Sequence, residues 1–200
     1  MPDVHGILLA AGESRRMGYP KPLLKVGDET FVAHLAAAML AVVTRLTVVV
    51  GARAERVRPA IPSDPRIRVV DNPNWTRGQL SSIKAGLRAL PPDASAAMIH
   101  LIDHPTVKAE TFAAVLEAYR ESQNTIIIAR HDGRRGHPVL FDRSIFTELL
   151  NAPEDQGARV VVNADASRVV YVDVDDPGIL LDLDTPEQLI AAGFVYPGRV

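Results

Sequence analysis

The feature that most constrains this chain is a short apolar run near its start that breaks into a basic, glycine-containing loop. Ile7 to Leu9 is continuous and apolar, and such a run close to glycines is typical of a buried strand. Residues 14–27 contain no acidic residue and supply cations at Arg15, Arg16, Lys21 and Lys25. Glycine lets backbone N–H groups approach a polyphosphate closely, and Arg and Lys neutralise its charge. The loop therefore predicts a phosphate-binding site after a first strand.

This loop matches neither of the common nucleotide fingerprints, because it contains no G-x-x-x-x-G-K-[ST] and no G-x-G-x-x-G. A basic surface loop after an edge strand is the plainer interpretation. Glycine, arginine and lysine nevertheless converge in one loop, which favours phosphate binding. The pattern L-A-A-G-x-S-x-R-M-G-x-x-K resembles the signature loop of the MobA-like nucleotidyltransferases, and among them the molybdenum-cofactor cytidylyltransferases. It is formed by Leu9, Ala10, Ala11, Gly12, Ser14, Arg16, Met17, Gly18 and Lys21.

Bulk composition limits the classes of function. A chain of 200 residues with 47% hydrophobic and 23% charged residues is ordinary for one globular domain spanning 1–200. The net charge of −2 argues against nucleic-acid and membrane-surface binding. Cysteine is absent, which excludes disulfides and cysteine nucleophiles. The start of the chain lacks the charged and apolar regions of a signal peptide, so we expect a cytoplasmic protein.

Strand-like and helix-like segments alternate along the chain. Besides the first run, strands are expected at 46–50, 66–70, 96–102, 125–129 and 168–174, and helices at 30–43, 52–60, 111–121, 144–150 and 157–164. The segment 76–83 leads into a further helix that runs to about Leu90. The dipeptide Asp132-Gly133 predicts a hairpin. The family resemblance implies a single α/β domain of the nucleotide-diphospho-sugar transferase type. That fold is a Rossmann-like three-layer α/β/α sandwich with a mostly parallel sheet and an antiparallel strand or hairpin.

A second candidate segment begins a helix. A glycine and hydroxyls at a helix start offer free N–H groups and short polar arms, although N-capping alone explains them. The cytidylyltransferase branch has a similar Gly-x-x-Ser-Ser segment where the base is recognised. The guanylyltransferase branch carries a second glycine where Ala11 stands here, so the resemblance favours cytidine. Nucleotide-binding residues are then expected here at Gly78, Leu80, Ser81 and Ser82, and in the signature loop at Leu9, Ala10, Ala11, Gly12, Ser14, Arg16, Gly18 and Lys21.

Two acidic segments are candidates for Mg²⁺ binding. Asp103 follows the strand 96–102, and ligands in open α/β sheets lie outside the carboxyl ends of strands, although an Asp there is equally often a cap. In the extended segment 182–184, Asp182 and Asp184 share one face and Leu183 the other. The family has Asp-x-Pro and Asp-x-Asp-Thr-Pro-Glu motifs at these places. The resemblance thus implies Asp103 and Asp184 as metal ligands, while the choice between Asp182 and Asp184 stays open.

A third segment is a candidate acceptor site. The hairpin at Asp132-Gly133 places Gly136 and His137 on the returning strand. A lone Gly-His-Pro triplet is more often turn chemistry. The same triplet occurs in the molybdopterin-nucleotide branch where the acceptor docks, and on that resemblance Arg135, Gly136 and His137 are expected to contact an anionic acceptor.

The resemblance implies transfer of CMP from CTP to the phosphate of molybdopterin, with Lys21, Arg16 and Asp103 as catalytic residues. The cofactor would be Mg²⁺ and a molybdoenzyme a transient partner. Nucleotidyl transfer rests on positioning and charge neutralisation, and an acceptor phosphate needs no general base. One alternative is a transferase that uses GTP or another nucleotide on a sugar phosphate or other small phosphate. Another is a non-catalytic protein that delivers a nucleotide or cofactor.

Overall fold

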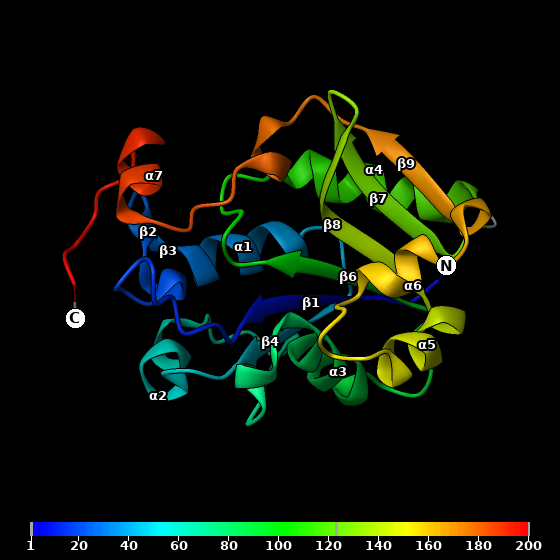
Figure 1. The fold of residues 1–200 in the computed structure, drawn as a ribbon, viewed down its shortest axis with the longest axis horizontal. Helices are drawn as coiled ribbons and strands as arrows, with labels where there is room; N and C mark the ends of the chain where they lie inside the picture. Colours follow the sequence, from blue (N-terminus) through cyan, green and yellow to red (C-terminus); the bar gives the residue numbers. More distant parts are fainter. Residues whose placement is uncertain (1, 123, 200) are drawn as a thin grey trace.

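The computed structural model describes residues 2–122 and 124–199, and it is built around a seven-stranded sheet (Figure 1). The strands lie in the order β5-β4-β1-β6-β8-β7-β9. All pairs are parallel except those made by β8, which runs antiparallel to β6 and β7. The bounds are β1 Val4–Ala10, β4 Arg45–Val50, β5 Ile67–Asp71, β6 Ala96–Leu101, β7 Ile126–His131, β8 Arg134–Asp142 and β9 Val169–Asp173. The predicted fold class is confirmed.

Helices cover both faces of the sheet because β1 is apolar and buried on both sides. Leu8 packs with α1 (Phe31–Leu40) and α4 (Ala109–Glu121). Ile7 and Leu9 pack on the other face, in a core that includes α3 (Gln79–Ala89), α5 (Phe146–Asn151) and α6 (Arg159–Asn163). The remaining helices are α2 Ala54–Val57 and α7 Pro186–Ala191, with 3-10 turns at Lys21–Leu23, Arg58–Ala60, Trp75–Arg77, Arg143–Ile145, Ala166–Arg168 and Pro177–Leu180.

Local signals account for many element boundaries. The Thr30 hydroxyl accepts a 3.3 Å hydrogen bond from the Ala33 N–H and caps α1. Asp132 and Gly133 have φ of 48° and 74°, which confirms the predicted hairpin turn between β7 and β8. The sequence pattern also suggests Ser144 as the cap of the helix at 144–150, and this is wrong. Asp142 accepts the hydrogen bond from Ser144 N–H, and a 3-10 turn precedes α5.

A small hairpin that the sequence pattern does not predict lies after the basic loop. It pairs β2 (Lys25–Val26) with β3 (Glu29–Thr30). Figure 1 shows α7 and the C-terminal segment beside this hairpin. The Tyr196 hydroxyl donates a 2.8 Å hydrogen bond to the Met17 carbonyl, so the chain end packs onto the basic loop. In the part of the chain that the structure describes, no helix is long and apolar enough to cross a membrane.

Candidate active site

The basic loop after β1 folds onto itself and turns one lysine inward. Ser14 adopts a left-handed conformation with φ of 58°, and its hydroxyl oxygen accepts a 3.0 Å hydrogen bond from the Lys21 N–H. The Gly18 N–H donates to the Ser14 carbonyl at 2.9 Å, and the Met17 side chain is fully buried. Lys21 is consequently only 7% exposed, although it is a lysine in a loop.

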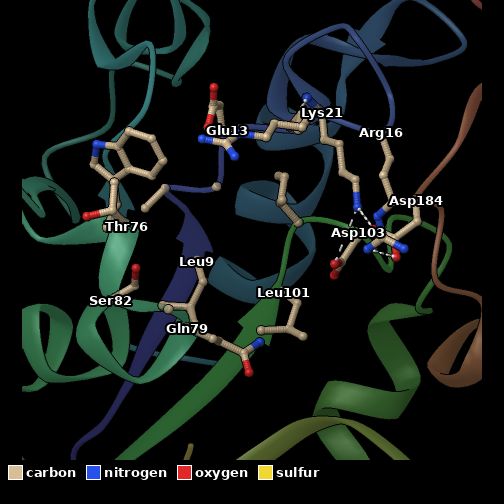
Figure 2. Close-up of a pocket in the computed structure, with 17 residues that line it drawn as sticks. Leu9, Glu13, Arg16, Lys21, Thr76, Gln79, Ser82, Leu101, Asp103 and Asp184 are labelled. Carbon is tan, nitrogen blue, oxygen red and sulfur yellow. Dashed lines mark hydrogen bonds and ion pairs between the residues drawn. The ribbon is translucent and has the colours of Figure 1, made fainter. Parts of the chain in front are cut away.

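A cavity of about 480 Å³ opens between this loop, the start of α3 and the end of β6. Figure 2 shows Lys21 and Arg16 reaching toward Asp103 and Asp184 in one part of it. In another part lie residues of the second candidate segment and its neighbours, among them Thr76, Gln79 and Ser82. Gly12 lines the same cavity, and a Cβ atom built on it would meet no protein atom within 4 Å. The backbone at Gly12 is therefore open to close approach by a ligand.

Gly12→Ala should weaken nucleotide binding without changing the stability of the fold. Gly12 has no positive φ, and an added methyl group would meet no protein atom, so we expect the melting temperature to stay within about 2 °C of wild type. The methyl group would enter the space where a phosphate must approach the backbone, so nucleoside triphosphate affinity should fall about tenfold or more. Differential scanning fluorimetry and calorimetric titration measure the two effects. Unchanged affinity would show that the phosphates do not approach Gly12.

The start of α3 is fixed by a buried polar network. The Asn72 side-chain amide donates to the Ser81 and Ser82 hydroxyl oxygens at 2.8 and 3.0 Å. The Ser81 hydroxyl also lies 2.7 Å from the Gly78 carbonyl oxygen. Gly78 has a φ of 99°, a conformation that favours glycine, and it precedes the first turn of α3 without a side-chain cap. Ser81 thus holds the loop in place, while Gly78 and Ser82 line the cavity.

Three carboxylates and two cations meet on the far side of the cavity. Oxygen atoms of Asp103, Asp182 and Asp184 lie within 4.8 Å of one another. The Lys21 Nζ atom is 2.5 Å from Asp184 Oδ1, 3.6 Å from Asp103 Oδ2 and 3.9 Å from Asp182 Oδ1. Arg16 forms an ion pair with the other oxygen of Asp184. The Leu183 N–H donates to the Asp103 carbonyl at 3.0 Å, which joins the two acidic segments.

This cluster fits a divalent cation that prefers oxygen ligands. Asp103 Oδ1 is buried and has no hydrogen-bond partner among the described residues, and a lone buried carboxylate oxygen is costly unless a cation satisfies it. Burial and the neighbouring Asp103 and Asp184 raise the pKa of Asp182. Burial would also raise the pKa of Asp184, but its hydrogen bond from Lys21 and the charges of Lys21 and Arg16 lower it overall. The site therefore carries an excess of negative charge for a metal to neutralise.

A second cavity of about 560 Å³ adjoins the first at Gly78 and Gln79. Its apolar lining includes Leu80, Ile83, Ile99, Ile128, Val139 and Phe141. The predicted acceptor residues Arg135, Gly136 and His137 line it as well. Packing also explains why residue 136 is a glycine, because a Cβ atom there would lie 2.3 Å from the Ile179 carbonyl oxygen. This cavity is suited to a ligand that has both apolar and polar parts.

Charged residues that the sequence pattern does not single out connect α3 to a wall of the second cavity. Lys84 is buried in α3, and its Nζ donates to the Ala152 carbonyl at 2.8 Å. The same nitrogen lies 3.7 Å from Glu154, which also pairs with Arg77. Residues 154–159 form this wall. Lys84 therefore ties α3 to the segment that closes the second cavity.

Three histidine rings pack together beside Asp103. The ring centroids of His100, His104 and His137 are 5.8 to 6.3 Å apart, and His100 Nε2 lies 3.1 Å from the His104 carbonyl oxygen. Burial and the neighbouring His104 lower the pKa of His137 from 6.5 to about 4, although Asp103 opposes the shift. Burial likewise lowers the pKa of His100 well below its usual value. Both rings are therefore neutral at pH 7.

These histidines should make the protein less stable in mild acid. The unfolded chain protonates His137 near pH 6.5, whereas the folded chain does so only near pH 4, so between these values the unfolded state binds the extra proton. Stability should fall as pH decreases through this window, by on the order of 2 kcal/mol for His137. Urea unfolding at pH 7 and pH 4.5 measures the difference, and His137→Asn should reduce it. An equally steep pH dependence in His137→Asn would contradict this account.

The structure gathers most of the predicted nucleotide-site residues at one cavity and leaves others outside it. Residues that line the first cavity are Leu9, Ala11, Gly12, Ser14, Arg16, Lys21, Gly78, Ser82, Asp103 and Asp184. Ala10 and Gly18 do not line it, Ser81 is turned toward Asn72, and Leu80 lines the second cavity. Glu13, Trp75, Thr76 and Gln79 also line the first cavity, and the sequence pattern did not single them out. In the sequence, only their position beside the two predicted segments could have indicated that they line the cavity.

Comparison with known protein families identifies the class of protein to which this chain belongs. A family model described as the MobA-like NTP transferase domain matches residues 6–169. The chain belongs to this family, whose members are nucleotidyltransferases. The expected family membership is confirmed.

Two curated relatives span nearly the whole chain. The "Nicotine blue oxidoreductase" of Paenarthrobacter nicotinovorans is 31% identical over 202 residues, covering 94% of this chain and 96% of that protein. The "Molybdenum cofactor cytidylyltransferase" of Escherichia coli K12 is 26% identical over 192 residues, covering 96% of each. The chain is thus similar to proteins with two different named activities.

Solved structures agree on the fold. A homologue of Mycobacterium tuberculosis Rv0371c from Mycobacterium sp. strain JC1 has a TM-score of 0.81 and 28% identity, covering 96% of each chain. Rv0371c from M. tuberculosis H37Rv in complex with manganese has a TM-score of 0.72 and 28% identity, covering 94% of this chain and 97% of that one. The second structure shows that a similar protein binds a divalent metal.

Proposed function

We propose that this protein transfers CMP from CTP to the phosphate of molybdopterin or the molybdenum cofactor and releases pyrophosphate. One observation carries the proposal. The loop cations Lys21 and Arg16 and the carboxylates of Asp103 and Asp184 meet in one cavity, with Asp182 in the same carboxylate cluster, and a second cavity lined by apolar and charged residues adjoins it. The first cavity has the charges that a triphosphate and its metal need, and the second has room for an acceptor.

The reaction forms one bond and breaks another at the α-phosphorus. An oxygen of the acceptor phosphate attacks this phosphorus, the bond to the oxygen bridging the α- and β-phosphates breaks, and pyrophosphate leaves with the electron pair. Lys21 and Arg16 would hold the phosphates, and the backbone at Gly12 and the Ser14 hydroxyl would donate hydrogen bonds. Mg²⁺ bound by Asp103 and the segment 182–184 would supply further neutralisation of phosphate charge. The acceptor phosphate is ionised at neutral pH, so the site needs no general base.

The choice of CTP rests on the segment before α3. Gly78 and Ser82 line the nucleotide cavity, and the Asn72 network fixes their positions. Ala11, where the guanylyltransferase branch has glycine, also lines the cavity. Arg135 and His137 would contact the acceptor in the second cavity. We also propose that the protein is cytoplasmic and that a molybdoenzyme receives the product.

A thermal-shift series tests the nucleotide part. The purified protein is heated with CTP, GTP, ATP or UTP, with and without Mg²⁺, since a ligand at a hundredfold its dissociation constant adds about 2.7 kcal/mol of stability. We expect the largest shift with CTP, and only with Mg²⁺ present. A largest shift with GTP would move the assignment to a guanylyltransferase or a sugar-phosphate transferase. No shift with any nucleotide would contradict the phosphate-binding role of the loop.

A second candidate function comes from the relative named as an oxidoreductase. Its 31% identity over nearly the whole chain is the observation in favour. An oxidoreductase needs an electron donor, so the purified protein would bind a reduced nicotinamide or a flavin and consume it with a suitable acceptor. Pyrophosphate release that depends on both a nucleoside triphosphate and a phosphate acceptor distinguishes the transferase from this candidate. The same readout excludes a non-catalytic delivery protein.

A further inference from the structure

Asp182 and Asp184 sit two residues apart in one extended segment, but their surroundings differ. Both oxygens of Asp184 already face cations, because Oδ1 accepts from Lys21 at 2.5 Å and the other oxygen pairs with Arg16. The Asp184 side chain is 17% exposed, and its backbone N–H donates to Gln188 at the start of α7. Asp184 is thus held in place and satisfied by the signature loop.

Asp182 has no such partners. Its closest cation is the Lys21 Nζ atom at 3.9 Å, and the side chain is 49% exposed. Among the described residues, no donor lies within hydrogen-bond distance of the Asp182 carboxylate, and Asp103 Oδ1 is buried without a partner. Asp103 and Asp182 therefore have oxygen lone pairs that are free to coordinate a cation.

Electrostatic repulsion by Lys21 also makes Asp184 less suited than Asp182 to bind a divalent cation. A divalent cation on Asp184 Oδ1 would lie beside the ammonium of Lys21, which contacts that same oxygen. Like charges at such a distance repel strongly in a partly buried site. Lys21 is buried and has little room to move away into solvent. The Lys21 Nζ atom lies farther from the other two carboxylates, 3.6 Å from Asp103 Oδ2 and 3.9 Å from Asp182 Oδ1, so it would repel a cation held by Asp103 Oδ1 and Asp182 less strongly.

We infer that the two aspartates have different roles. Asp182 binds the divalent cation together with Asp103, and Asp184 positions Lys21 and Arg16 for the nucleotide phosphates. This inference rests on the proposed function, because it assigns roles within the same site. It changes the expectation from the family resemblance, which names Asp184 as the second metal ligand. Asp184 is then a positioning residue for two phosphate-binding cations.

Charge-matched variants of the full chain test this division. Single Asp→Asn variants are ambiguous, because loss of Asp184 would free Lys21 to pair with Asp103 and Asp182 and so compete with the metal. We therefore compare K21Q/D182N with K21Q/D184N, which carry the same net charge and differ only in the aspartate removed. Mn²⁺ replaces Mg²⁺ as the probe, since carboxylate sites accept both ions and free Mn²⁺ is measured by electron paramagnetic resonance. No nucleotide is added, and thermal melts verify that both variants are folded.

We expect K21Q/D182N to bind Mn²⁺ at least about fivefold more weakly than K21Q/D184N. A ratio below that, or the reverse order, overturns the division of roles. Absence of Mn²⁺ binding to both wild type and K21Q overturns the metal site as a whole. Because the titration contains no nucleotide or acceptor, its result is independent of the proposed reaction. A protein that binds Mn²⁺ as expected but releases no pyrophosphate would retain this inference and lose the proposed function.

Discussion

Lys21→Met is expected to lower kcat/KM for pyrophosphate release at least about a hundredfold, the scale found when one preorganised charge partner of a reacting group is removed. Lys21 is the most buried cation of the signature loop and faces all three carboxylates. Methionine keeps an unbranched apolar stem that reaches as far as the Cε atom of lysine and removes only the charged end. The backbone N–H that donates to Ser14 is also kept.

The matched control for this variant is Lys25→Met. Lys25 is exposed, lies in β2 four residues further along the same loop, and does not line the cavity. Its substitution should leave turnover within about twofold of wild type, since exposed changes away from a site have small effects. Turnover in Lys21→Met equal to that of Lys25→Met would remove Lys21 from the mechanism.

Asp103→Asn should have the second large effect, a loss of about a thousandfold in kcat, because the metal would lose a ligand from its first coordination sphere. The substitution keeps the shape of the side chain. It also removes one negative charge from a group of three carboxylates, so the melting temperature should not fall. A fall in turnover with a maintained or raised melting temperature indicates a functional carboxylate, whereas a structural one would show the opposite.

Asp93→Asn is the control for this second variant. Asp93 is exposed, and it lies in the turn that precedes β6, the strand whose far end carries Asp103. Both variants lose one carboxylate from the same part of the chain. Wild-type kcat in both of them would exclude Asp103 from the reaction.

Local sequence signals predict a structural element well where a residue type strongly favours one conformation or one role, such as a buried strand, a turn or a helix cap. The apolar run at Ile7 to Leu9 lies within the central strand, and Asp132-Gly133 forms the hairpin turn. The run Thr185-Pro186-Glu187 predicts a helix start capped by Thr185, and Thr185 does cap α7 through a capping box with Gln188. Ser144 is not a cap, because Asp142 caps the 3-10 turn that precedes α5 and the Ser144 hydroxyl donates to the Asp142 carboxylate instead.

Contacts between distant parts of the chain could not be predicted in the same way. The Lys21–Asp184 contact joins residues 163 positions apart, and the Lys84–Ala152 contact joins residues 68 apart. Such contacts follow from packing of the whole sheet, which no local pattern encodes. Period-2 alternation does place Asp182 and Asp184 on one face. Only the tertiary structure reveals that Asp184 is already paired and Asp182 is not.

The measurement that tests the central claim most directly follows CTP labelled in its α-phosphate during incubation with the protein, Mg²⁺ and purified molybdopterin. The account predicts that pyrophosphate and a labelled acceptor form in equal amounts, that both require the acceptor and the metal, and that Lys21→Met loses them. Labelled GTP, ATP and UTP in parallel reactions test the choice of base. No pyrophosphate from any of the four nucleotides, together with acceptor reduction at the expense of a reduced nicotinamide, would contradict nucleotidyl transfer and support the oxidoreductase candidate.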